Sequence, residues 1–370
     1  MVLDLKLRNF GCASLIAAAS LLAPPAGGNP PATQMPLLVA RCPSGTTTVI
    51  LPAGSTTWTV NPCFNPSNNA LHAIAGGSAG AATNNSNGAG ADAGSPGYSE
   101  STNISLIPGA VISYQVGPAG TPAAASSGAI GTAGGTSYLC NSTSNCASIA
   151  GTAVVVGANP GTSPASSIAG GIGGSTTGAV GNALTQAGSN GCGANALYGA
   201  PSGAGTPGPN GVGGACALGS TSGNSGGPGG GGANGGAAGN APPNTVTGAG
   251  GQGGNNRLSA GAGTAGAANG GNGGPGSNGG GGGGGGGSIT LTGSGGNNSF
   301  DPIWTDSFTG TTTGPASGTG SVGGGAAAAM GALPTAVGCG ASPSGGSYFG
   351  GPIQASATPT QGCIVVQWTR

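Results

Sequence analysis

Nine consecutive glycines at residues 279–287 restrict what this chain can fold into more than any other feature. Glycine has no side chain to bury, and fixing its backbone loses more conformational entropy than fixing any other residue. Two structures suit such a run. It is either a flexible linker, or an extended left-handed helix with three residues per turn that packs against other segments of the same kind.

The composition favours the ordered alternative. The chain has 89 glycines and 28 prolines among 370 residues, a share that is typical of low-complexity chains. Disordered chains, however, are usually rich in charge and poor in apolar residues, whereas this one is 3% charged and 36% hydrophobic. A neutral chain of this kind would self-associate unless its backbone polar groups were paired internally. We therefore expect an ordered body.

Several function classes lack their usual sequence features. The net charge is zero, so no basic patch is expected to bind nucleic acid. No glycine motif precedes a Lys-Ser or Lys-Thr pair, which excludes a phosphate-binding loop. His72 is the single histidine, and we expect it to pack within a strand. Asp301 and Asp306 flank Trp304 without a basic residue nearby in the sequence, so we expect them to shape turns. The sequence predicts no enzyme, no cofactor and no metal site.

Nine cysteines are spread along the chain without any CxxC pair, so zinc and redox motifs are absent. Disulfides in an extracellular or virion setting are the preferred interpretation, and free buried thiols are the alternative. Cys140 and Cys146 are close enough to close a small loop, and the odd count leaves one thiol free or bonded to a neighbouring subunit. The candidate disulfide cysteines are Cys42, Cys63, Cys140, Cys146, Cys192, Cys216, Cys339 and Cys363.

The first 28 residues resemble a secretory signal, with a basic start, a short apolar stretch at 10–23 and small residues after it. The stretch is too short to span a bilayer. Pro24 would block cleavage directly after Ala23, and the alternative is an arm that docks into an assembly. Residues 24–36 are rich in proline and predict a stiff, extended connector.

Strand patterns gather near both ends of the chain. β-branched or alternating apolar residues predict strands at 46–51, 55–60, 70–75 and 363–368. Residues 98–117 predict a hairpin, with Ile104 and Leu106 on one strand and Ile112, Tyr114 and Val116 on the other. Pro108-Gly109 suits the tight turn between them, because proline presets φ and glycine accepts a positive φ.

These patterns predict a mainly β and irregular protein with little α-helix, in which a small β-layer from both chain ends brackets a glycine-rich body. The expected parts are an N-terminal segment at 1–45, a strand layer with the first glycine-rich block at 46–117, the glycine-rich body at 118–298, and an aromatic and glycine-rich segment with a closing strand at 299–370. We expect Trp58 and Trp368 in the core of the β-layer.

Four landmarks in matching order resemble the glycine-rich proteins of phage tails. They are residues 55–77 (STTWTV, an Asn-Asn pair and a strand entering glycine), 97–117, 304–315 (WTD, TGTTTG and Pro) and 362–369. The resemblance covers about residues 46–370. It implies a domain in which polyglycine-II helices pack into a sandwich and variable loops contact a receptor. Many positions where that family has glycine hold Ala, Ser or Asn here, so these are expected to face outward unless the packing is looser.

The resemblance implies a non-enzymatic virion protein, a tail fibre or tail-tip adhesin for host-surface binding or display. Its expected partners are other tail proteins, copies of itself, and a host receptor that is a sugar or an outer-membrane protein. A capsid or tail decoration protein is a close variant. A secreted bacterial surface or matrix protein and a disordered linker are the alternatives.

Exposed aromatic side chains beside Asn, Ser and Thr suit receptor recognition, because rings give a large contact area at a low entropy cost. The alternative for Trp304, Tyr348 and Phe349 is that they close the ends of the glycine body. The candidate receptor contacts are Tyr138, Tyr198, Trp304, Phe308, Tyr348 and Phe349.

Overall fold

The computed structural model describes residues 42–83, 89–194, 200–219, 226–243, 248–285, 292–319, 321, 334–344 and 353–370. All of them belong to one compact unit, Cys42–Arg370, and the fold given below is that of this unit alone. The segment predicted to be a signal or a docking arm lies outside the described residues. No helix in the described part of the chain has the length and apolar character needed to cross a membrane.

The described residues form eleven strands and no helix, which confirms the prediction of a mainly β and irregular protein with little α-helix. Most strands hold β-branched or aromatic residues, which suit a pleated, half-buried surface. The strands are β1 (Thr46–Leu51), β2 (Thr57–Thr59), β3 (Asn69–Ile74), β4 (Tyr98–Thr102), β5 (Val111–Gln115), β6 (Ser137–Cys140), β7 (Val154–Ala158), β8 (Leu184–Gln186), β9 (Trp304–Thr305), β10 (Thr312–Thr313) and β11 (Cys363–Thr369).

Three antiparallel sheets contain these strands. One has five strands in the order β1-β11-β3-β4-β8, one has four in the order β2-β5-β6-β7, and β9 pairs with β10. Strand β11 lies between β1 and β3, so that Val366 is opposite both Val49 and Leu71. The prediction that strands from both ends of the chain share one layer is therefore confirmed.

The five-stranded and four-stranded sheets share a core. Leu71, Ile364 and Trp368 from the first sheet pack with Ile112 and Leu139 from the second. The alternation in β3, β5 and β11 places Leu71, Ile112, Ile364 and Trp368 on the inward faces of their sheets, as expected for strands with a period of two. Trp368 is buried, and Trp58 packs against the same cluster as a partly buried ring. The β-layer is thus a two-sheet sandwich.

The predicted hairpin at 98–117 is wrong. Strand β4 pairs with β3 and β8, whereas β5 pairs with β2 and β6, so the two strands lie in different sheets. Asn103 has a φ of 55° and turns the chain away from the first sheet, and Ile104 lies outside any strand. The turn at Pro108-Gly109 is present, with the Ala110 amide donating to the Ile107 carbonyl at 3.0 Å.

All eight candidate cysteines form disulfides, so the alternative of free buried thiols is wrong for them. These bonds fit an extracellular or secreted protein, because disulfides persist in oxidising compartments. Cys12 lies outside the described residues. The pairs are Cys42–Cys63, Cys140–Cys146, Cys192–Cys216 and Cys339–Cys363.

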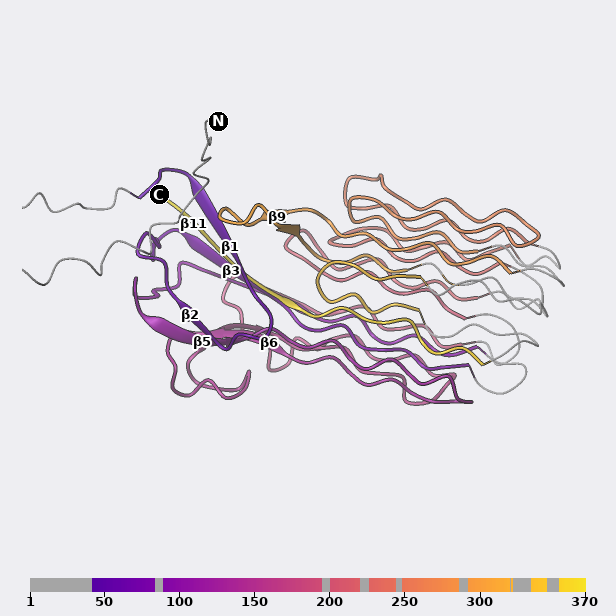
Figure 1. Cartoon of the computed structure of the whole chain (residues 1–370), viewed down its shortest axis with the longest axis horizontal. Coiled ribbons are helices and arrows are strands. Elements are labelled where there is room, and N and C mark those ends of the chain that lie inside the picture. The colour runs from indigo at the N-terminus through magenta and orange to yellow at the C-terminus, as the bar shows by residue number, and fades with distance from the viewer. Residues whose placement is uncertain are drawn as a thin grey trace, which may run out of the picture. The chain divides into compact units, whose positions relative to one another are not determined.

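The glycine-rich segments form a body of extended runs that lie side by side, with the strands of the two larger sheets at one end of them (Figure 1). Residues 281–285, which belong to the nine-glycine run, occupy a central position. Each of their five amides donates to a neighbouring run, and each of their five carbonyls accepts from another, at 2.7–3.1 Å. These five glycines are therefore ordered and fully paired.

The pairing of residues 281–285 repeats every three residues. Gly281 and Gly284 both donate to the run at 250–254 and both accept from the run at 263–266. Including the partners of the residues between them, the run has six neighbours, at 227–230, 250–254, 263–266, 274, 296 and 318–321. A three-residue repeat is that of the extended left-handed helix, and the body is a polyglycine-II-like sandwich. Some neighbours run parallel to residues 281–285 and others run antiparallel.

The expectation that non-glycine positions face outward is wrong for the first glycine-rich block. Every described residue from 71 to 83 and from 89 to 99 is buried, including several alanines and serines. Ala79 fits because Gly131 lies opposite its methyl group and has no side chain. The Ser78 hydroxyl donates to the Gly161 carbonyl at 2.7 Å and accepts from the Gly134 amide at 3.0 Å. Inside the body, small side chains thus pack against neighbouring runs and form hydrogen bonds with their backbone groups.

Asp92 departs from this pairing, as do the hydroxyls of Thr83 and Ser99, but it alone of the three carries an ionisable group. Its side chain is fully buried, and neither carboxylate oxygen has a hydrogen-bond partner. Burial raises the pKa of Asp92 well above its usual value, because a low-dielectric surrounding disfavours the charged form. The amides of Ala93 and Ala204 offset this shift in part, although neither makes a hydrogen bond of normal geometry.

We expect Asp92→Asn to stabilise the protein at neutral pH. The unfolded carboxyl titrates near 3.8 and the folded one well above it, so the free energy of unfolding falls as pH rises from about 4 through the folded pKa. A neutral amide removes this dependence. Thermal unfolding of both proteins between pH 4 and pH 8 should show that the variant unfolds at a higher temperature than wild type at pH 8. The gap between the two unfolding temperatures should shrink toward pH 4.

Asp306→Asn is the matched control, and its expected effect has the opposite sign. Burial alone would raise the pKa of Asp306, but hydrogen bonds from the amides of Ile50, Thr309 and Phe308 outweigh it and lower the pKa. The carboxylate therefore stabilises the fold above its unfolded pKa, and the variant should be less stable at pH 8. If the unfolding temperatures of wild type and Asp92→Asn instead change with pH in the same way, Asp92 is not buried as described.

Candidate functional site

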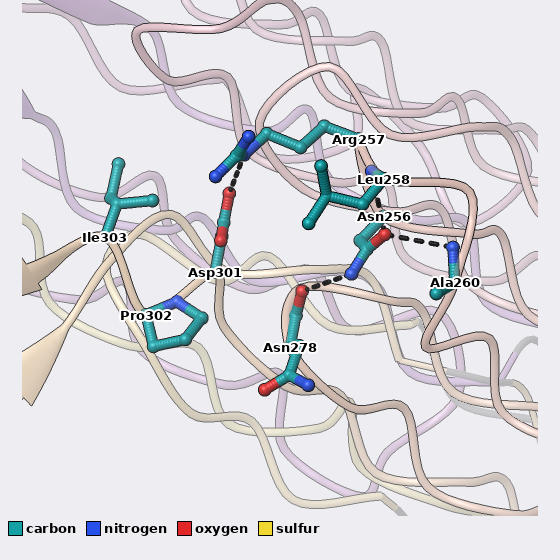
Figure 2. Close-up of a pocket in the computed structure, with 8 residues that line it drawn as sticks. All are labelled: Asn256, Arg257, Leu258, Ala260, Asn278, Asp301, Pro302 and Ile303. Atoms are coloured by element: carbon teal, nitrogen blue, oxygen red, sulfur yellow. Dashed lines mark hydrogen bonds and ion pairs between the residues drawn. The ribbon is translucent and has the colours of Figure 1, made fainter.

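One cavity in the described part of the chain combines buried polar groups with an exposed apolar wall. It has a volume of about 460 Å³ and lies between the turn at 256–260 and the segment at 301–303. We call it the Arg257 pocket. Figure 2 shows Leu258 on one side and Pro302 and Ile303 on the other side of the pair formed by Arg257 and Asp301.

The turn that presents Arg257 is held by the buried side chain of Asn256. Its Oδ1 accepts from the amides of Leu258 and Ala260 at 2.9 and 3.0 Å, and its Nδ2 donates to the Asn278 carbonyl at 2.9 Å. Asparagine favours turns because its short side chain can bond to backbone groups a few residues ahead. Ser259 adopts a φ of 59° within this turn. The position of Arg257 is therefore fixed by its neighbours.

Asp301 is held in place by side chains from two other runs of the body. Its Oδ2 accepts from Asn234 Nδ2 at 2.7 Å and from Arg257 Nε at 3.0 Å, and its side chain is 9% exposed. A buried carboxylate needs such partners, because an unpaired charge in the interior is costly. No basic residue is close to Asp301 in the sequence, and its basic partner Arg257 lies 44 residues away along the chain.

Part of the ion pair remains available to a ligand. No described residue bonds to Asp301 Oδ1, and this atom is not among the buried unpaired atoms, so solvent reaches it. Only Nε of the Arg257 guanidinium has a described partner, which leaves the Nη donors open. The pocket thus offers hydrogen-bond donors and an acceptor in a locally neutral pair, next to an apolar wall.

The aromatic residues predicted as receptor contacts do not form one surface. Trp304 is only 2% exposed and packs with Ile74, Tyr98 and Val365 on the outer face of the five-stranded sheet. Tyr138 is 4% exposed and lies in a small buried cluster beside the loop that the Cys140–Cys146 disulfide closes. Both predictions as contacts are therefore wrong, because these rings already fill cores.

Phe308 agrees with the prediction of an exposed aromatic residue. Its side chain is 66% exposed, and it lies in the turn between β9 and β10, where its amide donates to Asp306 Oδ1 at 2.9 Å. The other predicted contacts, Tyr198, Tyr348 and Phe349, lie outside the described residues. Phe308 does not line the Arg257 pocket.

His72 lies within a buried polar network, as the sequence interpretation of a packed histidine expects. Its Nδ1 is 2.8 Å from the Tyr98 hydroxyl and its Nε2 is 3.0 Å from Gln367 Oε1. Tyr98 in turn donates to Glu100 at 2.9 Å. Burial lowers the pKa of His72, and the Glu100 carboxylate and Gln367 oppose this shift. No group of three His, Cys, Asp or Glu side chains among the described residues could hold a metal ion.

Sequence reasoning missed Arg257, although one feature of the sequence pointed to it. Arg257 is the single charged residue between Glu100 and Asp301. A lone charge in so long a neutral stretch indicates either a pairing partner elsewhere or a contact with a ligand. The resemblance to phage tail proteins stays a prediction, because comparisons with protein-family models and with characterised proteins returned no match to this chain.

Proposed function

We propose that this protein is a non-enzymatic structural protein of a phage virion, of the tail-fibre or tail-tip adhesin type, and that it binds or displays binding groups to a host surface. The observation that carries the proposal is the six-neighbour packing of residues 281–285. It supports the polyglycine-II sandwich that the resemblance implies. Copies of the same chain, other tail proteins and a host receptor are the proposed partners.

This architecture suits display, because its cohesion depends on backbone groups. Each backbone hydrogen bond contributes only about 1 kcal/mol, but the body contains many, and they require no particular side chain on its outer surface. Outward positions are therefore free to carry recognition groups. Phe308 and Leu258 are examples of large apolar side chains left exposed on this charge-poor protein.

The four disulfides favour a second candidate, a secreted bacterial surface or matrix protein with the same body. Such bonds form on export to an oxidising compartment. The signal-like residues at the start of the sequence agree with this candidate. A capsid or tail decoration protein is a variant of the first proposal that keeps the virion location.

Immunogold electron microscopy separates these candidates. An antibody raised against residues 42–370 should label one end of phage tails in lysates of the source culture if the first proposal is correct. Labelling of the bacterial envelope, together with a mature protein that begins near residue 26 by mass spectrometry, would support the secreted candidate. Labelling spread over capsids would support decoration. The fluorescently labelled protein should also bind host cells in a saturable way.

A further inference from the structure

We propose that the Arg257 pocket binds a neutral sugar unit. The inference rests on the proposed function, because a protein that binds a host surface encounters glycans there. It goes further by naming the ligand class and the residues that recognise it. The argument uses the open atoms of the ion pair, the apolar wall and the rigidity of the turn.

The polar groups of the pocket match a pair of neighbouring hydroxyls. A hydroxyl both donates and accepts hydrogen bonds, so one hydroxyl can donate to Asp301 Oδ1 while the next accepts from Arg257 Nη. These are the atoms that no described residue uses. A ligand carboxylate would meet the negative charge of Asp301, and a ligand amine would meet the positive charge of Arg257. A neutral polyol is the chemistry that satisfies both groups.

The apolar wall matches the other face of a sugar ring. Leu258 is 68% exposed and forms this wall, while Pro302 and Ile303 line the pocket on the other side of the ion pair (Figure 2). One face of a pyranose carries mainly C–H groups, and covering exposed leucine with such a face removes apolar surface from water. The pocket volume of about 460 Å³ lies within the range of roughly 300–1,000 Å³ found for small-molecule sites.

The site is also organised before any ligand arrives. Asn256 makes three hydrogen bonds that fix the turn, and Asn234 holds the Asp301 carboxylate from another run. Groups already held in place lose little entropy when a ligand binds. Even with a low affinity, the pocket can therefore discriminate between sugars by the positions of their hydroxyls.

Arginine side-chain NMR tests the proposal directly, because the chain has only four arginines, at 8, 41, 257 and 370. The Nε–H signal of Arg257, assigned by its loss in Arg257→Lys, is followed during titration of the intact protein. The probes are the methyl glycosides of glucose, galactose, mannose and N-acetylglucosamine. We expect a saturable shift with at least one of them in the millimolar range, and smaller shifts with glucuronate and glucosamine.

Two leucine variants separate the pocket from the rest of the surface. Leu258→Ser should weaken binding of the best glycoside about tenfold, as measured by saturation-transfer NMR. Leu218→Ser, at another exposed leucine that does not line the pocket, should leave the affinity unchanged. Arg257→Lys keeps the charge but loses the planar fork of donors, and it should also lose binding.

Either of two results would overturn the inference. One is the absence of any Arg257 shift with neutral glycosides up to about 50 mM, well above the millimolar range of a weak site. The other is tighter binding of glucuronate than of every neutral probe, which would indicate an anion site. The proposed function is tested by a different experiment, because the titration contains no cells. It fails if the wild-type protein shows no saturable binding to host cells.

Discussion

A single methyl group at position 284 is expected to lower the free energy of unfolding by about 3 kcal/mol or more, the upper range for overpacked cores. A Cβ atom built on Gly284 would clash with the backbone carbonyl of Gly227. Gly284 also donates to Gly251 and accepts from Gly266, so no side of the residue is free. Denaturant unfolding of Gly284→Ala, followed by tryptophan fluorescence, measures the loss.

Ala265→Val is the matched control, because it adds two carbon atoms to a run that contacts Gly284. Ala265 is exposed, between the inward residues Gly263 and Gly266, so the added methyl groups face solvent and the stability should change by less than about 0.5 kcal/mol. Amide hydrogen exchange at residues 281–285 should become fast in Gly284→Ala and stay slow in Ala265→Val. Equal losses in the two variants would contradict the inward and outward assignment.

Removal of the Cys339–Cys363 disulfide is expected to have the second large effect. This bond joins the glycine body to β11 and closes a loop with a sequence separation of 24. Loop-closure entropy for that length gives a loss of about 3.5 kcal/mol. Cys339 is fully buried beside Trp304, so the double substitution to alanine should cost more than this value.

The Cys192–Cys216 disulfide provides the control, because it has the same sequence separation of 24. Its entropy contribution should therefore be equal, but it links two runs of the body, and both of its cysteines are only half-buried. We expect the double alanine substitution there to cost about 3.5 kcal/mol and no more. If the two double variants lose the same stability, the burial of Cys339 adds nothing to the anchoring of β11.

The sequence was sufficient for strands whose side chains alternate. Leu71 and Ala73 in β3, and Ile364, Val366 and Trp368 in β11, share the core that their spacing predicts, because a strand with one buried face shows this directly in its pattern. The failed hairpin has a local cause. A positive φ at Asn103 redirects the chain between sheets, and asparagine only permits such a conformation without requiring it.

The packing order of the glycine runs could not be predicted from the sequence. Register in a sheet is specified by which side chains must be buried, and residues 281–285 have none. The Arg257 pocket was missed for the same reason. Arg257 and Asp301 are 44 residues apart, and they meet only because the runs that carry them stack in one particular order.

The central place of β11 in its sheet has a consequence for how the protein is made. Strands β1 and β3 obtain their shared neighbour only after synthesis has passed residue 369, almost 300 residues after β3. At roughly 5–20 residues per second, their unpaired edges wait for about 15–60 seconds on the ribosome. Such edges are templates for aggregation, so this chain needs either a chaperone or an early-folding glycine body to keep them apart until β11 arrives.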